Sequence, residues 1–456
     1  MKKKINEGRG GVSRREFIGI SGLAIAGASI ASTSVAAKDS KKKDIRIKQT
    51  RVLGRTGFAA SDISMGCASL KEGNLVRYAY DKGLNYFDTA EAYGRGTSES
   101  AIGKAMPYMD RKKIFVTTKL DLKMDDTDQA LIERFSKCLA RLNTDYIDAL
   151  LIAGAMSADQ LKSEAFHSAV KKLKADGRLK HAGVSCHGPR GMAGDSMEKV
   201  LVTAAEDGRF DIVLLVYNFL NKKEGENILA ACKKYNLGTT AMKVAPGILK
   251  DVPDFDPQKP NKEQEERIKM MMGFGMDRKA AIAQVKSMVE GDKLAREQTK
   301  PFVAKYGLKT EEQLWAASIK WARQNSDMHT VCITMADFDK ADRSIALSGK
   351  NLTSAQASLL RDYGNKLGFS YCRHACNECS VSCKHSVPVS TIMRYSYYYE
   401  QGYEKLAMEK YAALKERNEN NAVPCAGCEA PCEGSCPYGV MVRNNLLNAH
   451  SMLTLV

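Results

Sequence analysis

Cysteine is the residue type whose number and spacing point most directly to chemistry in this sequence. The chain has 13 cysteines in 456 residues, and eight of them fall in the last 85 residues in two sets of four. The sets are Cys372, Cys376, Cys379 and Cys383, and then Cys425, Cys428, Cys432 and Cys436. Four closely spaced thiols can hold an iron–sulfur cluster or a zinc ion, or form disulfides in an oxidising compartment. We therefore expect a C-terminal part with its own chemistry.

The second set resembles a ferredoxin cluster run, because two residues separate Cys425 from Cys428 and Pro437 follows Cys436. Such a run takes one ligand from the other run. The resemblance implies that residues 371–456 are a ferredoxin-like extension with two 4Fe-4S clusters. Three residues stand between cysteines where bacterial ferredoxins mostly have two, and the first set lacks the proline, so the cluster that each cysteine joins stays open. Zinc sites and disulfides remain alternatives.

Two further patterns surround these cysteines. Residues 393–414 hold six tyrosines at mainly helical spacing, which predicts a helix that shields the clusters by packing. Five other cysteines fall in predicted strands or helices, and we interpret them as buried small hydrophobic residues. These are Cys67, Cys138, Cys186, Cys232 and Cys332.

Upstream of the tail, apolar runs alternate with helical patterns, which predicts parallel βαβ units. Strands are expected at 63–67, 86–89, 114–118, 147–152, 182–185, 212–217, 239–244 and 331–334. Eight such strands predict an α/β fold, a (β/α)8 TIM barrel over residues 51–366. Residues 245–308 form a long insertion whose 262–305 part is helical in pattern, and we expect a possible lid there.

Chemistry in such a barrel collects at the carboxyl ends of the strands. The second predicted strand ends in YFDTAEAYG at 86–94, and Ser98 and Glu99 follow. This segment resembles the signature of the aldo/keto reductase family, and LGRTG at 53–57 and MGC at 65–67 resemble the family's opening. The resemblance covers residues 51 to 350. It implies a barrel that binds a nicotinamide dinucleotide across its mouth and exchanges hydride with a carbonyl or alcohol.

The resemblance also implies roles for three polar residues. Reduction of a carbonyl by hydride leaves a developing alkoxide, which needs a proton donor and a stabilising field. Tyr93 is the expected donor, Lys119 at the end of the third strand supplies a nearby cation, and Asp88 holds that lysine. The family's fourth polar residue is a histidine after the fourth strand, but Ala153 stands there. Losing such a donor costs about 100-fold or more in rate.

The chain offers one substitute for that histidine, and its cofactor contacts are also reduced. His187, after the fifth strand, is the nearest candidate by topology, unless it is an ordinary loop histidine. Ser185 is kept as a cofactor contact, and Tyr217 matches a ring-stacking aromatic residue. Cys186 and Leu214 stand where the family has Asn and Gln.

The last predicted strand ends at Thr334, the third expected cofactor contact, and the segment that follows, 334–339, is acidic where the family places a cation for the 2′-phosphate of NADP. Carboxylates repel that phosphate. NAD, a tightly held NADP, or no nicotinamide therefore all remain open.

The N-terminus resembles a twin-arginine export signal over residues 1–37. SRREFI at 13–18 precedes a short apolar run and a small-residue cleavage pattern at 34–36, and a basic linker follows at 38–50. The resemblance implies export by the twin-arginine translocase to the periplasm. That route carries folded proteins, so it favours a cofactor inserted beforehand. An uncleaved membrane anchor is the alternative.

Composition excludes several classes of protein. Apolar residues make up 44% of the chain, which suits a globular core. The net charge is +16, but the lysines are dispersed, so we expect no nucleic-acid partner. After the signal no apolar stretch is long enough for a membrane span, so none is expected in the mature form.

The sequence thus predicts an exported oxidoreductase of the aldo/keto reductase type, with a small carbonyl or alcohol substrate and, as a further candidate partner, an electron-transfer protein for its clusters. A second hypothesis is a reductase-like barrel that has given up hydride transfer and acts in electron transfer or binding. A third is a structural protein held together by zinc.

Overall fold

The structure is a computed structural model that describes residues 45–189, 194–246, 254–273, 276–308, 312–373, 376–401, 403–417 and 419–454. The predicted signal at 1–37 lies outside these residues, as does the linker up to residue 44. Ile45–Val456 form one compact unit. Within the described ranges, no helix combines the length and the apolar character needed to cross a membrane.

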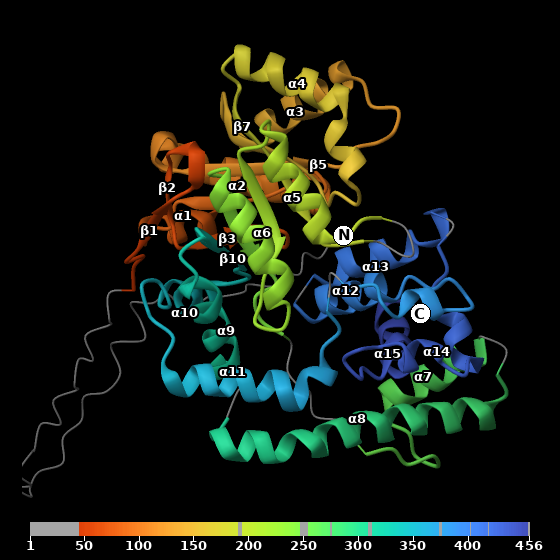
Figure 1. Cartoon of the computed structure of the whole chain (residues 1–456). Coiled ribbons are helices and arrows are strands. Elements are labelled where there is room, and N and C mark those ends of the chain that lie inside the picture. Colours follow the sequence, from red (N-terminus) through yellow and green to blue (C-terminus); the bar gives the residue numbers. More distant parts are fainter. Residues whose placement is uncertain are drawn as a thin grey trace, which may run out of the picture. The chain divides into compact units, whose positions relative to one another are not determined.

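Eight parallel strands form a closed barrel, which confirms the predicted (β/α)8 architecture (Figure 1). In order around the barrel they are β10 (Thr330–Thr334), β3 (Ile63–Gly66), β4 (Tyr86–Asp88), β5 (Phe115–Leu120), β6 (Ile147–Ile152), β7 (Leu179–Cys186), β8 (Ile212–Val216) and β9 (Gly238–Met242). A hairpin of β1 (Thr50–Val52) and β2 (Ala59–Ser61) precedes them. All residues of β5, β6, β8 and β9 are buried, as expected for parallel strands covered on both faces.

Helices connect the barrel strands in sequence. They are α1 (Gly73–Asp81), α2 (Thr97–Ala105), α3 (Asp128–Leu142), α4 (Glu164–Ala175), α5 (Met197–Asp207), α6 (Lys222–Lys234), α9 (Glu312–Gln324), α10 (Phe338–Ile345) and α11 (Ser354–Leu367). Local capping explains where several begin, because the side chains of Thr127, Ser163 and Ser196 accept hydrogen bonds from the first turns of α3, α4 and α5.

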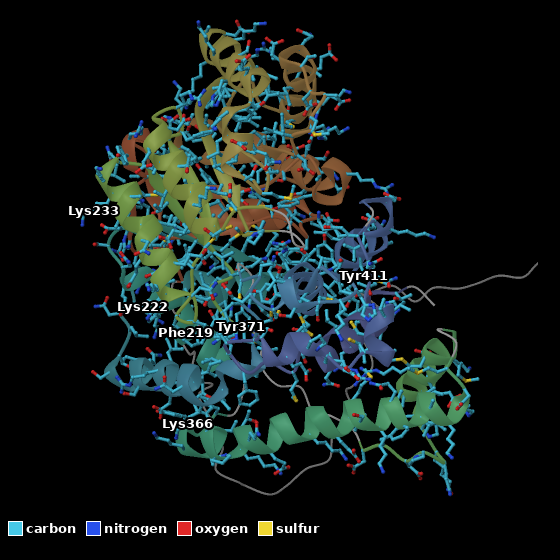
Figure 2. The ribbon with its side chains drawn as sticks, turned by 45° about the vertical axis from the view of Figure 1, so that its right-hand side comes forward. Phe219, Lys222, Lys233, Lys366, Tyr371 and Tyr411 are labelled. Carbon is cyan, nitrogen blue, oxygen red and sulfur yellow. The ribbon has the colours of Figure 1, made fainter. Side chains whose placement is uncertain are left out.

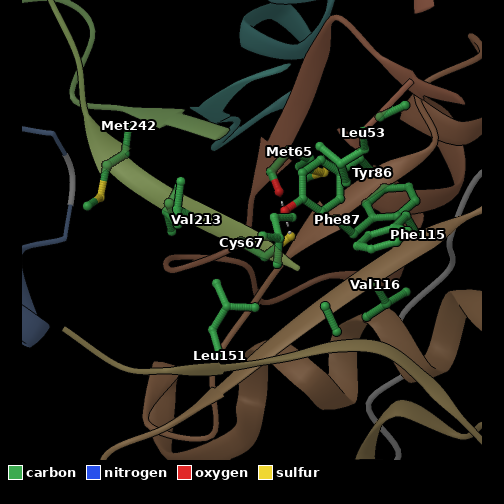
Figure 3. Packing of buried hydrophobic residues seen from close by; sticks show 14 of the residues in the cluster. Leu53, Met65, Cys67, Tyr86, Phe87, Phe115, Val116, Leu151, Val213 and Met242 are labelled. Carbon is green, nitrogen blue, oxygen red and sulfur yellow. Dashed lines mark hydrogen bonds between the residues drawn. The ribbon is translucent and has the colours of Figure 1, made fainter. Parts of the chain in front are cut away.

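Large side chains fill the interior of the barrel. The rings of Tyr86 and Phe115 lie 5.3 Å apart, and the Tyr86 hydroxyl is 3.2 Å from Thr240 Oγ1 across the barrel. Figure 3 shows both rings close to Met65 and Phe87. A filled interior leaves the strand ends as the place for reactive residues.

The predicted insertion forms α7 (Lys262–Gly273) and α8 (Arg278–Tyr306). The lid interpretation of 245–308 stays a prediction, and its residues 247–253 lie outside the described residues. Ile268, Met271, Val285 and Met288 of these helices are buried in the hydrophobic cluster of the tail, and Figure 1 shows α7 and α8 next to α14 and α15. The apolar face of the helix pair is therefore buried against the tail.

The tail contains α12 (Val389–Glu400), α13 (Glu404–Ala412), α14 (Pro431–Gly434) and α15 (Val442–Leu453). The single tyrosine-rich helix predicted for 393–414 is wrong in one respect, because the chain breaks after Glu400 and starts a new helix at Glu404. This break turns Tyr403 toward the barrel, where its hydroxyl is hydrogen bonded to that of Thr334.

Candidate functional site

Two buried charges face each other at the ends of neighbouring strands. Asp88 ends β4, Lys119 lies near the end of β5, and parallel pairing brings the two strand ends together. Lys119 Nζ lies 2.7 Å from Asp88 Oδ2 and also donates to the carbonyl oxygen of Thr89 at 2.7 Å. Thr117 Oγ1 donates to the other carboxylate oxygen at 2.7 Å. Burial lowers the pKa of Lys119, but Asp88 and Tyr93 together with Cys332 outweigh it, so the pKa of Lys119 is raised.

Tyr93 stands beside this pair. It begins the turn after β4, in which Gly94 and Arg95 both adopt left-handed backbone angles. Lys119 Nζ lies 5.1 Å from the centre of the Tyr93 ring. Burial raises the pKa of Tyr93, and the charge of Lys119 acts in the opposite direction. The phenol therefore stays protonated at neutral pH, which is the form that can donate a proton.

A cavity of about 750 Å³ opens above these three residues. Asp88, Tyr93 and Lys119 line its barrel side, and residues of α12 and α13 from the tail line the side facing them. None of the cavity-lining residues comes from the described part of the α7–α8 segment. The tail therefore lines the cavity together with the barrel, and of the predicted insertion only Ala245 and Pro246, among the described residues, do so.

The structure brings most of the predicted cofactor contacts to this cavity. Ser185 and Thr334 line it, and so do Ala153 and His187. Ser185 also holds the loop after β6, because its Oγ accepts from Gly154 N at 2.8 Å and donates to Ile152 O at 3.1 Å.

Tyr217 is the exception, since it is not among the cavity-lining residues. Its ring packs 4.9 Å from Trp321 and against Gly225, where a Cβ atom would lie 2.3 Å from the tyrosine ring. Asn325 Nδ2 donates to its hydroxyl at 3.2 Å. In this structure Tyr217 is a packing residue between α6 and α9.

Sequence reasoning missed several cations and aromatic residues of the cavity. Lys243 follows β9 directly, and Arg394 comes from α12. Lys340 and Arg343 of α10 also line the cavity, and Lys340 Nζ lies 3.7 Å from the centre of the Trp315 ring. Asp337 of the acidic segment caps α10 by accepting a hydrogen bond from Lys340 N. The helix that begins at this cap carries Lys340 and Arg343 to the cavity. A helical pattern that starts at Asp337 was the sequence signal that could have predicted Lys340 and Arg343 as cavity residues.

Two of the tail tyrosines, Tyr395 and Tyr411, pack in the same buried cluster as tail cysteines, and several tail tyrosines also reach the barrel cavity. Tyr395, Tyr397, Tyr398 and Tyr403 line the cavity of the barrel, whereas Tyr411 packs with His450 inside the tail (Figure 2). Two of the cysteines interpreted as buried hydrophobic residues, Cys67 and Cys332, line the cavity as well. Burial raises the pKa of both thiols, so both are protonated at neutral pH.

The eight tail cysteines form two groups of mutually interacting side chains. Burial raises the pKa of Cys372, and so do the charges of Cys379, Cys376 and Cys436. Burial raises the pKa of Cys425 to about 12, and the charges of Cys383, Cys432 and Cys428 contribute to this rise. Each group therefore contains three cysteines of one sequence set and the last cysteine of the other. Cys432 also acts on Cys379, so the two groups are neighbours.

Backbone amides approach two of these sulfur atoms. Val387 N donates to Cys383 Sγ at 3.3 Å, and Ala430 N donates to Cys428 Sγ at 3.4 Å. Such donors stabilise negative charge on sulfur. Among the described residues, no three or more Cys, His, Asp or Glu side chains are placed to hold a single metal ion.

Comparisons with known proteins agree with this barrel. The model of the aldo/keto reductase family matches residues 67–364, which is more than half of the chain. L-galactose dehydrogenase of Arabidopsis thaliana is 24% identical over 321 residues, covering 65% of this chain and 87% of that protein. D-threo-aldose 1-dehydrogenase of a Pseudomonas species is 24% identical over 230 residues, covering 41% and 67%.

Other matches are shorter or more distant. Probable aldo-keto reductase 1 of Glycine max is 30% identical over 155 residues, 29% of this chain, and the match spans less than half, 43%, of that relative. The solved holo form of an aldo-keto reductase from Bacillus halodurans is 18% identical with a TM-score of 0.48, covering 69% of this chain and 95% of that one. On the match of the family model to its barrel, the chain belongs to the aldo/keto reductase family.

Proposed function

We propose that this protein is an exported oxidoreductase that exchanges hydride between a nicotinamide dinucleotide and a carbonyl or alcohol, with two 4Fe-4S clusters in its tail. The observation that carries the hydride part is the placement of Asp88, Tyr93 and Lys119 together on the wall of one cavity. Membership of the aldo/keto reductase family supports it.

The three residues divide the acid–base work. Tyr93 donates the proton to the oxygen that becomes an alcohol, and accepts it in the reverse direction. Lys119 lowers the energy of the tyrosinate that remains, because its ammonium group lies beside the ring. Asp88 fixes the position of Lys119 through the 2.7 Å contact. With Ala153 unable to donate a hydrogen bond, His187 on the neighbouring loop is the proposed substitute that orients the substrate oxygen.

The cavity suits a nicotinamide dinucleotide in size and charge. Its volume is about 750 Å³, and Lys340 offers positive charge for phosphate groups, whereas Arg343 is paired with Glu312 at 3.5 Å. Ser185 and Thr334 provide hydroxyl groups next to the reactive residues. When bound, the nicotinamide would supply or accept the hydride. Separate titrations of NADH and NADPH decide which of the two dinucleotides the chain binds.

The two thiol groups of the tail suit two 4Fe-4S clusters. The first would be held by Cys372, Cys376, Cys379 and Cys436, and the second by Cys425, Cys428, Cys432 and Cys383, following the groups described above. This cross-sharing of the fourth ligand is the arrangement of two-cluster ferredoxins. The clusters would exchange single electrons with a partner or hold the tail together. Paired zinc sites remain the competing occupant.

Two observations favour a second function, in which the barrel serves electron transfer or binding without hydride exchange. Ala153 occupies the place of the family's histidine, and Tyr403 of the tail occupies the hydroxyl of Thr334, an expected nicotinamide contact. Both features reduce the number of side-chain hydrogen bonds that the barrel can form with a nicotinamide and its substrate.

The experiment that separates the two functions is a titration of NADH and of NADPH into anaerobically purified mature protein of known metal content. Nicotinamide fluorescence follows the binding. Binding of either dinucleotide supports hydride exchange and names the cofactor. Binding of neither, to protein with intact clusters and no copurified nicotinamide, contradicts hydride exchange and supports the second function.

Export by the twin-arginine translocase completes the proposal. Arg14 and Arg15 stand in the pattern SRREFI before a short apolar run, and a small-residue cleavage pattern follows at 34–36. Clusters inserted before transport are compatible with this route, because it carries folded proteins. We place the mature protein in the periplasm.

A further inference from the structure

Lys243 has an unusual backbone and an unusual environment. It is the first residue after β9, at the carboxyl end of a barrel strand, where its φ of +53° is one that residues other than glycine rarely adopt. Asn218, fully buried, holds this turn by donating from Nδ2 to the carbonyl oxygen of Lys243 at 3.0 Å. A strained lysine at the reactive end of a barrel indicates a functional constraint.

The side chain of Lys243 is buried, at 8% exposure, and it lines the cavity. Its Nζ lies 3.4 Å from the hydroxyl oxygen of Tyr398 and 4.6 Å from the centre of that ring, with the Tyr397 ring at 5.8 Å. Aromatic faces attract a cation, but they do not neutralise it. Among the described residues, no carboxylate forms an ion pair with Lys243.

A second buried cation lines the same cavity. Arg394 of α12 is 2% exposed and lines the same cavity, and its guanidinium donates to the carbonyl oxygen of His187 at 3.3 Å. Burial lowers the pKa of Lys243 far below its ordinary value, and the charge of Arg394 lowers it further. A buried cation that no carboxylate neutralises is unfavourable unless an anion binds beside it, and within the described residues Lys243 is such a cation.

We propose that Lys243 and Arg394 form a subsite that binds an anionic group of the substrate, a carboxylate or a phosphate. The proposal rests on the proposed function, and it names the substrate class as carbonyl or alcohol compounds that carry such a group. The position suits a small substrate, because Tyr398 contacts Lys243 and also acts electrostatically on Tyr93, the proposed proton donor.

The test uses two anions that need no chemistry, oxalate and inorganic phosphate, each titrated calorimetrically into the mature protein with its clusters intact. We expect at least one of them to bind. Lys243→Met should weaken that binding about tenfold or more, the typical effect of losing one hydrogen bond to a charged group. Lys243→Arg, which keeps the charge, should retain most of it. Lys366→Met is the matched control, because Lys366 is exposed at the end of α11 (Figure 2) and should leave binding unchanged.

Arg394→Gln provides a second route to the same answer, should Lys243→Met fail to fold, and should weaken binding in the same direction. Unchanged affinity in both variants, or no binding of either anion to the native protein, would overturn the subsite.

NADH and NADPH form the other arm, because a dinucleotide diphosphate is also an anion. If Lys243→Met weakens dinucleotide binding but leaves oxalate and phosphate binding intact, the anion belongs to the cofactor and the substrate assignment is wrong. The anion titration needs no nicotinamide. If the protein shows no hydride exchange but still binds the anion in a Lys243-dependent way, the proposed function is wrong and the anion subsite stands.

Discussion

Lys243 of the barrel and Tyr398 of the tail meet across the cavity, with 3.4 Å between Nζ and the hydroxyl oxygen. The contact joins the end of β9 to α12, so the tail forms one wall of the site that the barrel strands build. A change in the tail can therefore reach the reactive residues directly.

Substitution Tyr93→Phe should reduce turnover by about 100-fold or more, because it removes the proposed proton donor while keeping the ring. The measurement is the oxidation of NADH or NADPH by a reducible substrate, followed by absorbance under anaerobic conditions. Tyr108→Phe is the control, because Tyr108 is 63% exposed and is not among the cavity-lining residues. Turnover that is unchanged in Tyr93→Phe would refute the assignment.

Removing one member of the Asp88–Lys119 pair should destabilise the fold more than removing both. Lys119→Met leaves a buried carboxylate without its cation, which costs about 3 kcal/mol or more in free energy of unfolding. The double variant Asp88→Asn/Lys119→Met should recover much of this stability and none of the activity. Denaturant unfolding of the three proteins tests this, and a double variant as unstable as Lys119→Met would contradict it.

Serine variants of the tail cysteines should reveal the shared ligands. In Cys372→Ser/Cys436→Ser both lost ligands belong to one proposed cluster, so about half of the iron and sulfide should remain. In Cys372→Ser/Cys383→Ser each cluster loses a ligand, so both should be lost.

Iron and acid-labile sulfide analysis of anaerobically prepared protein gives the answer. The reverse pattern would mean that each sequence set holds its own cluster. Zinc without iron or sulfide in the native protein would favour the structural zinc hypothesis.

Acid should weaken the tail through His450. Burial lowers the pKa of His450 to about 4, below the 6.5 or so of an exposed histidine. Between these values the unfolded chain binds a proton that the folded chain does not, so stability falls as the pH drops from 6.5 toward 4, by on the order of 3 kcal/mol.

Thermal unfolding midpoints measured across this pH range in the native protein and in His450→Gln test the prediction. The variant should show a shallower loss of stability on acidification. Parallel curves for the two proteins would count against it.

Replacing both Arg14 and Arg15 by lysine should stop export. The unprocessed precursor should then accumulate in the cytoplasm of a bacterial host with a twin-arginine translocase, while the native protein is found outside it in a shorter form. Cell fractionation and mass determination measure both outcomes. Continued export of the lysine variant would exclude this route.

The sequence by itself determined the barrel and the reactive residues at its strand ends. Apolar runs such as that of β6 alternate with helices, which favours a parallel sheet, and the number of eight such runs is typical of a closed barrel. Because parallel strands end on one face, Asp88 and Lys119 had to meet. The two sets of four cysteines were equally visible, since their spacing is local.

Only the tertiary structure decided what encloses the cavity. Lys243 and Arg394 lie far apart in the sequence, and neither belongs to a motif, so their place on one cavity depends on how the tail packs on the barrel. The same packing directs α7 and α8 to the tail instead of the cavity, moves Tyr217 away from it, and regroups Cys383 and Cys436. Periodicity describes which face of an element is apolar, but the partner of that face is chosen by complementary surfaces from distant parts of the chain.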